Sequence, residues 1–295
     1  MSQGNLIART SFAVLGAGLL FCAASTSLAA PPEHQERHFP VKGHPRVVLQ
    51  NIVNGRIEVK SSKNSEIIVG STAATDKVSI EIEQVGDRID ISANSIGNAS
   101  QPQDVEANFQ LTVPEETELQ LKTQTGLIYV EQVNGDMKLE SVAGDVHLKE
   151  VSGYIIVKTT GGTLICTSCA GKLEFTSISG NAQLLQPMFT SVNLITMTGN
   201  ILYDGDFVRT GLYTMKSGRG LVEVRFSGND SFDLTAHTQL GTVDNQAAAF
   251  LHPDTHGSPR SSSKWRKSLT ATLGQGLARV ELSSYSGTIR ILKRN

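Results

Sequence analysis

The chain has 295 residues, of which 27 are glycine and only 5% are aromatic. Its 26 basic and 28 acidic residues give a formal net charge of −2 at pH 7, which provides no electrostatic reason to bind nucleic acid. Few aromatic residues and many glycines, with Thr, Ser and Val prominent, predict strands joined by tight turns.

The first 29 residues have the pattern of a secretory signal peptide. Arg9 supplies a weak positive region, an apolar stretch of about 13 residues follows, and Ser27-Leu28-Ala29 fits a small-x-small cleavage site. An uncleaved anchor is less favoured because the stretch is too short to span a bilayer comfortably. Lipidation at Cys22 is disfavoured by the bulky Phe21 before it. We expect an exported protein, periplasmic or on the cell surface, with no transmembrane span after cleavage.

Residues 30–45 are expected to be an N-terminal linker, and residues 46–114 to form the first coils or a cap of a single domain over residues 46–295. Apolar residues alternate with polar ones in this part of the chain: Val78, Ile80 and Ile82 before the turn at Gly86-Asp87, then Phe109, Leu111 and Val113 before Pro114. Alternation with period two is typical of strands that bury one face.

Glycines then recur every nine residues, at Gly126, Gly135, Gly144, Gly153, Gly162, Gly171 and Gly180. A fixed period of this kind indicates a repeat architecture. With glycine as position 1, three further columns are mainly apolar: position 3 (Ile128, Met137, Val146, Ile155, Leu164, Leu173, Ala182), position 5 (Val130, Leu139, Leu148, Val157, Cys166, Phe175, Leu184) and position 8 (Val133, Val142, Val151, Thr160, Cys169, Ile178). We expect these three columns to face inward and the glycine to serve a bend with positive φ.

Two units make one coil, because the residue three before the glycine is a hydroxyl residue in every second unit. This column is Thr123, Ser141, Thr159, Ser177 and Thr196, while alternate units carry Gln132, Glu150 and Ser168; the glycines beyond Gly180 continue at Gly199 and Gly218. A coil of 18–19 residues that stacks at strand spacing is a β-solenoid. The sequence therefore predicts an all-β, single-stranded β-solenoid with regular coils over residues 115–244 and an N-terminal β cap.

Residues 245–268 leave the repeat and are expected to be a long loop. The loop contains the only tryptophan of the chain, within Lys264-Trp265-Arg266-Lys267. Long loops are either functional or disordered, and an aromatic side chain among cations suits contact with an anionic surface, such as lipid headgroups or an acidic glycan. The alternative is that Trp265 only packs the loop against the solenoid. Residues 269–295 are expected to return to strand and close the stack.

Four segments resemble a known family: Phe109-Gln-Leu-Thr-Val-Pro114, Leu121-Lys-Thr-Gln-Thr-Gly126, Phe175-Thr-Ser-Ile-Ser-Gly180 and Leu282-Ser-Ser-Tyr-Ser-Gly287. They resemble the exported β-solenoid proteins of the bacterial putative-adhesin, or toast-rack, family, over roughly residues 40–295. The resemblance implies the architecture and offers no catalytic motif to carry over.

The chain has few candidates for chemistry. Cys166 and Cys169 occupy positions 5 and 8, so they are core residues that form either a structural disulfide or buried free thiols. A redox site would need this motif at a helix N-terminus. A zinc site would need two more ligands. His252 and His256 in the long loop could contribute, but loop histidines at that spacing are usually solvated.

The sequence pattern does not predict a pair of catalytic carboxylates. Asp204 and Asp206 flank Gly205 beside Arg209 and form a weak acidic cluster, for which a solvated turn is the simpler interpretation. Cleavage of polysaccharides needs two carboxylates on one face. Charges 18 residues apart are expected to form stacked surface ion pairs, Glu131 with Lys149 and Glu140 with Lys158.

The hydroxyl column also admits an ice-binding interpretation, but Ala143 and Gly161 interrupt its Thr-x-Thr pattern, and a hydroxyl ladder along a stack is the ordinary structural role. Sugar binding would prefer a row of exposed aromatics, and only Tyr129, Tyr154 and Tyr213 are available. We predict a non-catalytic, adhesin-like structural or interaction module of the cell envelope, with an envelope protein or surface glycan as partner and no cofactor. The alternative is a carbohydrate-active or carbohydrate-binding β-solenoid.

Overall fold

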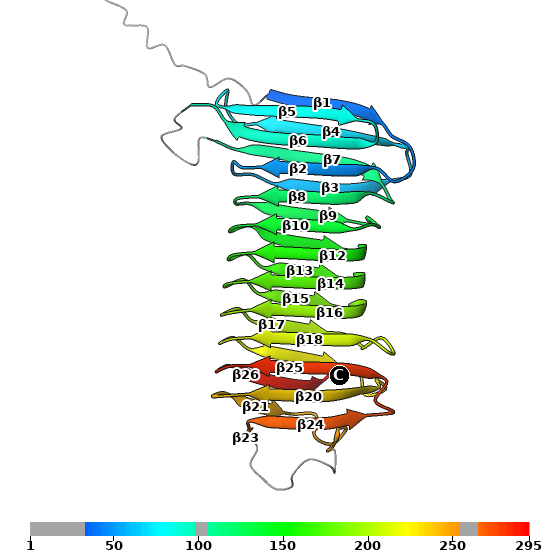
Figure 1. Ribbon diagram of the computed structural model, residues 1–295, viewed down its shortest axis with the longest axis vertical. Helices are drawn as coiled ribbons and strands as arrows, with labels where there is room; N and C mark the ends of the chain where they lie inside the picture. The colour runs from blue at the N-terminus through cyan, green and yellow to red at the C-terminus, as the bar shows by residue number, and fades with distance from the viewer. Residues whose placement is uncertain (1–32, 98–104, 254–264, 295) are drawn as a thin grey trace, which may run out of the picture. The chain divides into compact units, whose positions relative to one another are not determined.

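The computed structural model describes residues 33–97, 105–253 and 265–294, which belong to one compact unit, Pro32–Asn295. The expected signal peptide, residues 1–29, lies outside the described residues. Every regular element of the described residues is a β-strand, and the strands form two sheets of thirteen strands each (Figure 1).

The two sheets are named sheet A and sheet B. In spatial order, sheet A contains β1 (Glu33–Pro40), β4 (Glu66–Ala73), β7 (Ala107–Pro114), β3 (Ile57–Ser62), β9 (Leu127–Glu131), β11 (Asp145–Lys149), β13 (Leu164–Thr167), β15 (Ala182–Leu185), β17 (Ile201–Asp204), β19 (Val222–Phe226), β26 (Thr288–Lys293), β21 (Thr242–Asn245) and β23 (Trp265–Arg266). In the same way, sheet B contains β22 (His252–Pro253), β24 (Ser268–Leu273), β20 (Phe232–Thr238), β25 (Ala278–Ser284), β18 (Leu212–Ser217), β16 (Met188–Thr196), β14 (Ala170–Ser177), β12 (Ser152–Thr159), β10 (Met137–Ser141), β8 (Glu118–Thr123), β2 (Arg46–Asn51), β6 (Arg88–Ser95) and β5 (Val78–Val85).

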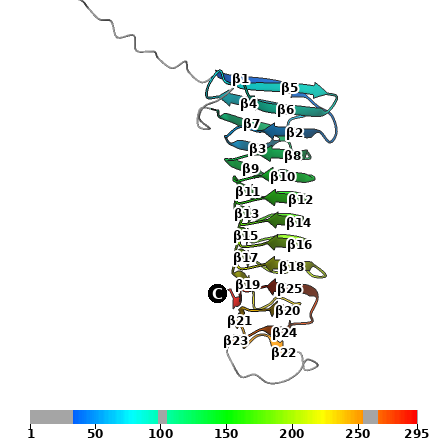
Figure 2. The same cartoon turned by 60° about the vertical axis from the view of Figure 1, so that its left-hand side comes forward.

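From β8 to β19 each coil adds one parallel strand to each sheet, which confirms the predicted β-solenoid (Figure 2). Leu139 pairs with Leu121 on one side and Val157 on the other, a register of 18 residues. The register between β14 and β16 changes from 18 to 19 residues at Thr190. This extra residue forms a bulge between the pairs Gly171–Phe189 and Lys172–Ser191.

One coil is longer than the sequence repeat predicts. Leu194 pairs with Met215, 21 residues on, and Gly220 rather than Gly218 stacks on Gly199. The additional residues lie between β17 and β18, where Phe207 stacks on Tyr203 with ring centroids 4.7 Å apart. These aromatic side chains fill the core of the longer coil, together with Tyr213, Phe226 and Phe232.

The prediction that three columns face inward is confirmed at positions 3 and 5 and for half of the residues at position 8. Every residue of the columns at positions 3 and 5 is buried, from Ile128 to Leu184. At position 8, Val133, Val151 and Cys169 are buried, whereas Val142, Thr160 and Ile178 are exposed. The reason is that the strands of sheet B run on to the Ser/Thr column, so the hydroxyl residue takes the inward place and its successor points outward.

The corner that follows the Ser/Thr column is held by side-chain hydrogen bonds. Each hydroxyl accepts from the backbone N–H of the glycine three residues on, at 2.7–3.1 Å: Ser141–Gly144, Thr159–Gly162, Ser177–Gly180, Thr196–Gly199, Ser217–Gly220, Thr238–Gly241 and Ser284–Gly287. A Cβ at Gly144 would overlap the carbonyl oxygen of Gly126 in the preceding coil. Gly144 is not among the residues with positive φ, so close approach of two coils, and not the expected positive φ, requires glycine there.

The opposite corner uses the left-handed conformation instead. Gln132, Glu150, Ser168 and Gln186 have φ between 51° and 59°. The glycines that follow in these units, Gly135, Gly153 and Gly171, also have positive φ, as predicted. The two corners of a coil are therefore built differently, one on a hydroxyl–glycine hydrogen bond and the other on a strained non-glycine residue.

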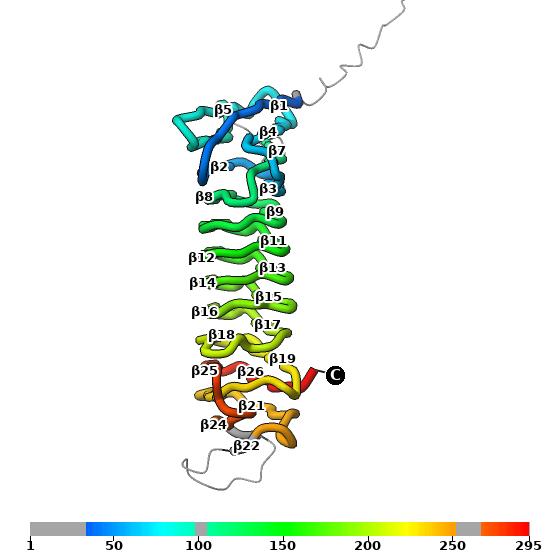
Figure 3. The backbone as a smooth tube through the Cα atoms, turned by 90° about the vertical axis from the view of Figure 1, so that its right-hand side faces the viewer, coloured from blue at the N-terminus to red at the C-terminus, as the bar shows by residue number. Residues whose placement is uncertain are grey.

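At both ends of the stack the order of the coils in space differs from their order in the chain. The coil of β2 and β3 lies between that of β6 and β7 and that of β8 and β9 (Figure 1). Figure 3 shows β2 and β3 between β7 on one side and β8 and β9 on the other. Likewise β25 and β26 lie inside the stack, between β18–β19 and β20–β21. The expectation that residues 269–295 close the stack therefore holds for β24 and is wrong for β25 and β26. Antiparallel strands cap the ends: β1, β4 and β5 at one, and β22, β23 and β24 at the other. Strand β1 lies in the segment expected to be a linker.

Candidate functional site

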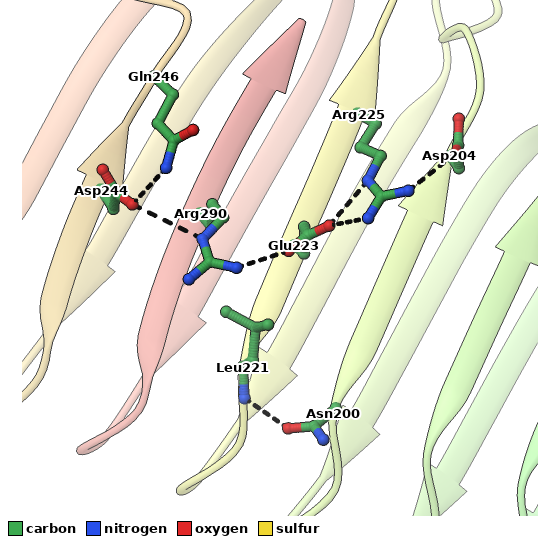
Figure 4. Close-up of polar contacts among 8 residues, drawn as sticks. All are labelled: Asn200, Asp204, Leu221, Glu223, Arg225, Asp244, Gln246 and Arg290. Atoms are coloured by element: carbon green, nitrogen blue, oxygen red, sulfur yellow. Dashed lines mark hydrogen bonds and ion pairs between the residues drawn. The ribbon is translucent and has the colours of Figure 1, made fainter. Parts of the chain in front are cut away.

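A ladder of alternating charges crosses the outer face of sheet A from β17 to β21 (Figure 4). Its centre is Glu223 in β19, whose side chain is only 8% exposed. Arg225 Nε donates to one carboxylate oxygen at 2.7 Å, and Arg290 Nη1 in β26 donates to the other at 3.1 Å. The pKa of Arg225 is raised above its usual range, mainly because of the hydrogen bond to Glu223.

The ladder continues to an aspartate at each end. Arg290 Nε lies 3.6 Å from Asp244 Oδ2, an ion pair without a hydrogen bond, and Asp244 Oδ2 accepts a hydrogen bond from Gln246 Nε2 at 2.8 Å. Asp244 Oδ1 is buried and has no hydrogen-bond partner among the described residues. At the other end, Arg225 Nη1 lies 3.5 Å from Asp204 Oδ2.

This ladder accounts for the predicted acidic cluster. Arg294 lies 3.6 Å from Asp204 and 2.9 Å from Asp206, so each carboxylate is engaged by a guanidinium group. The partners are Arg225 and Arg294, distant in sequence, and not the neighbouring Arg209. A shallow hollow of about 710 Å³ beside them is lined by residues from the coils of β13, β15 and β17 and by Arg294. Both of its carboxylates are paired with arginine.

The two cysteines lie where the repeat predicts. Cys166 and Cys169 are both fully buried, with their Cα atoms 6.1 Å apart and their sulfur atoms in contact. This Cα separation is within the range that a disulfide allows. Among the described residues, no group of three or more His, Cys, Asp or Glu side chains could hold a metal ion. His256 lies outside the described residues, and only the backbone of His252 is described.

The basic segment at the end of the long loop is partly described. Lys264 lies outside the described residues, and the backbone of Trp265 and Arg266 forms β23, paired with Asp244 and Val243. Lys267 is exposed, and its carbonyl oxygen accepts a hydrogen bond from Thr238 N–H at 2.8 Å. The segment therefore joins the two sheets at the corner that carries the Ser/Thr column.

The same corner carries a feature that the sequence analysis missed. The outward residues that directly follow the Ser/Thr column form a line, which we call the corner row: Val142 (48% exposed), Thr160, Ile178 (54%), Met197 (62%), Gly218, Tyr285 (55%) and Gln239. Leu240 (62% exposed) lies next to its far end. Assigning position 8 to the core throughout hides the first three of these residues. Had strand alternation been continued through Ser141 and Ser177, the outward direction of Val142 and Ile178 would have followed.

Of the remaining surface features expected from the sequence, one is confirmed and two are wrong. Glu131 and Lys149 form the predicted ion pair at 2.7 Å, whereas Glu140 pairs with Lys138 in its own strand, at 2.9 Å, instead of with Lys158. Tyr213 is buried, and its hydroxyl donates to the Phe189 carbonyl at 2.6 Å, so it is not available to a sugar.

Comparison with known proteins agrees with this architecture. A family model described as Toastrack DUF4097 matches residues 44–292. Among solved structures, the chain is similar to a putative cell adhesion protein from Clostridium sporogenes (9% identity over 90% of this chain and 100% of that chain, TM-score 0.30) and a putative adhesin from Bacteroides fragilis (9% over 89% and 97%, TM-score 0.40). It is also similar to a putative adhesin from Parabacteroides distasonis (11% over 88% and 97%, TM-score 0.33). No curated protein matches the chain.

Proposed function

Because the chain belongs to the Toastrack family, we propose that it is a non-catalytic, adhesin-like interaction module of the cell envelope. The observation that carries the proposal is the corner row. Single exposed apolar residues are common on any protein, but Val142, Ile178, Met197 and Tyr285 gather at one edge of the stack, and a gathered apolar patch marks a surface that contacts a partner. Here the core is filled independently of the row, since the inward places at this corner are taken by Ser and Thr.

The charge ladder supports a structural role for the carboxylates. Glu223 and Asp244 are nearly buried, and Arg290 on the strand between theirs pairs with both, while Arg225 also pairs with Glu223. Removing one member of such a set leaves an uncompensated charge, so the ladder fixes the order of strands β17, β19, β26 and β21. This role accounts for the carboxylates of the charge ladder without assigning them to catalysis.

The export of the chain is part of the same proposal and depends on the signal pattern of residues 1–29. Among the described residues, no helix is long and apolar enough to cross a membrane. An envelope module of this kind would reach its partner through its surface.

The proposal is tested by co-sedimentation of the chain with isolated bacterial envelope fragments. We use the chain from Pro32 onward, a compact unit that contains the whole described core, so that the apolar stretch of residues 1–29 does not itself bind membrane. We expect binding that the double variant I178S/M197S weakens. A matched control is M188S/L212S, which changes two residues that are each 58% exposed and begin strands β16 and β18 at the opposite corner.

Absence of binding, or equal binding by both double variants, would contradict the proposal. Turnover of an envelope polysaccharide that is lost in D204N/D206N would instead establish the carbohydrate-active alternative.

A further inference from the structure

The corner row runs along the stack beside backbone hydrogen bonds that join successive coils, and Gly218 takes the place between Met197 and Tyr285. Ser179 N–H donates to the Thr160 carbonyl at 2.8 Å, Thr198 N–H to the Ile178 carbonyl at 3.0 Å, and Leu240 N–H to the Tyr285 carbonyl at 2.7 Å. With neighbouring strands about 4.8 Å apart, the five steps from Val142 to Tyr285 give the row a length of about 24 Å.

Two shallow hollows run beside the row and meet each other. The first, of about 500 Å³, lies between Val142, Ile178 and the last outward side chains of β8 to β16. The second, of about 600 Å³, continues past Tyr285 to β25 and β20. Ile195 and Met197 line both hollows, so the two form one groove with an apolar wall.

The charged residues that line this groove are mostly basic. Lys122 and Lys158 line the first hollow, and Lys216 and Arg219 line the second, which also contains His237. Of the lining residues, all of which are described, Glu140 is the one carboxylate, and Lys138 neutralises it at 2.9 Å. Lys216 also pairs with exposed Glu281 at 3.4 Å. The groove is thus cationic on a chain whose net charge is −2.

The far end of the row carries further positive charge. Beyond the coil of Thr238 and Leu240, the next backbone at this corner is that of Lys267, which accepts the hydrogen bond from Thr238 N–H. Lys267, the last residue of the basic segment that the sequence analysis proposed for contact with an anionic surface, therefore adjoins the same edge and is exposed.

We propose that this edge lies on an anionic lipid bilayer, with the corner row entering the headgroup region and the lysine and arginine side chains meeting the phosphates. The inference rests on the proposed function and names its partner. An apolar line flanked by cations is the combination that binds a lipid interface.

Two other occupants fit less well. A second copy of the chain would bring two cationic grooves together, which is unfavourable. An extended peptide would bind by adding a strand, but the N–H groups along the row are already donated to the neighbouring coil.

The experiment uses the chain from Pro32 onward and protein-free vesicles, either of phosphatidylcholine alone or of equal parts phosphatidylcholine and phosphatidylglycerol. We expect binding to the anionic vesicles only, reduced when ionic strength rises from about 0.1 M to about 1 M, because the Debye length falls from about 10 Å to about 3 Å. I178S/M197S and, separately, K158E/R219E should each weaken binding at least about tenfold. M188S/L212S and K172E, an exposed lysine at the other end of β14, should not. Urea unfolding of each variant shows that the fold is kept.

Equal binding to neutral and anionic vesicles, or no binding to either, would overturn the inference. So would binding that the two corner variants leave unchanged. If the chain binds envelope fragments through the corner row but not protein-free vesicles, the proposed function stands and the lipid partner is rejected. In that case, competition by a soluble acidic polysaccharide would identify a glycan partner.

Discussion

The hydroxyl of Ser217 donates to the Gly199 carbonyl oxygen of the preceding coil at 2.8 Å while it accepts from Gly220 N–H in its own coil at 2.8 Å. One small side chain thus satisfies a buried donor and a buried acceptor from two coils. The same arrangement holds for Thr196, which donates to Gly180 at 3.0 Å. The column is therefore a polar seam within an apolar core.

Removing one hydroxyl from this seam should be costly. We expect Ser217→Ala to lower the free energy of unfolding by about 1–3 kcal/mol, because the N–H of Gly220 is left buried without a partner. Ser217→Thr is the control, since threonine occupies equivalent places at Thr159 and Thr196. Urea unfolding measures both, and an alanine variant as stable as the parent would show that water replaces the hydroxyl.

The glycines of this corner should be intolerant of a methyl group. Gly144→Ala should lower the free energy of unfolding by about 1–3 kcal/mol or more, because the Cβ would overlap the Gly126 carbonyl and the stacked backbone cannot move away. Gly161→Ala is the matched control in the next coil. Its Cβ would meet only Ser179 Oγ, at 3.4 Å. Equal melting temperatures for the two variants would contradict the role of close approach.

The opposite corner should discriminate by backbone conformation. Ser168 has a φ of 54°, which asparagine adopts readily and β-branched residues do not. We expect Ser168→Asn to keep the stability of the parent and Ser168→Val to lose about 1–2 kcal/mol. Thermal unfolding compares the two variants, and a valine variant as stable as the asparagine variant would mean that this corner can change its conformation.

We expect Cys166 and Cys169 to be joined by a disulfide in the exported protein. The chain from Pro32 contains no other cysteine. Alkylation in denaturant without reductant should then leave both unmodified, as mass spectrometry detects, and prior reduction should add two groups. Two groups added without reduction would establish free thiols.

Stability should depend on pH through Asp230. Burial raises the pKa of its carboxyl, against hydrogen bonds from Phe207 N–H and Ser231 N–H; Asp206 also raises the pKa and Arg294 lowers it. The folded state therefore holds the proton more tightly than the unfolded chain, so this contribution to stability is present below the unfolded pKa of about 3.9 and is lost as pH rises through the folded value.

Asp230→Asn removes this contribution. The difference in free energy of unfolding, parent minus variant, should fall between about pH 3 and about pH 7. Urea unfolding at several pH values measures it, and a difference that rises with pH would show that the hydrogen bonds outweigh burial.

Regular spacing made the middle of the stack predictable. The columns of Leu139 and Phe175 and the hydroxyl column from Ser141 to Ser177 follow from a period of nine, because every coil there has the same length. The period fails after Thr196, where two extra residues shift the glycine from 218 to 220. The local motif survives the shift, since Ser217, Thr238 and Ser284 each precede a glycine by three residues, and a search for that motif would have extended the column.

The charge ladder could not be found in this way. Glu223 and Arg290 are 67 residues apart and meet only because β26 inserts beside β19. No local pattern in the sequence states which strand a late segment joins. Long-range pairing of this kind depends on which arrangement satisfies all buried charges and hydrogen bonds together.

The inserted position of β25 and β26 affects how the chain can reach its native state. Coils from β8 to β19 can assemble in the order in which they are synthesised, each on the one before. Strand β20 cannot, because both of its neighbours, β24 and β25, come later in the chain. In a chain that emerges amino end first, β20 and β21 can pair with β24 and β23 but cannot join the stack until β25 and β26 arrive, which makes the final step slow and dependent on distant contacts. A protein shortened by its last twenty residues would consequently lack a coil from the interior of the stack. An ordinary solenoid shortened in the same way would lose only its terminal coil.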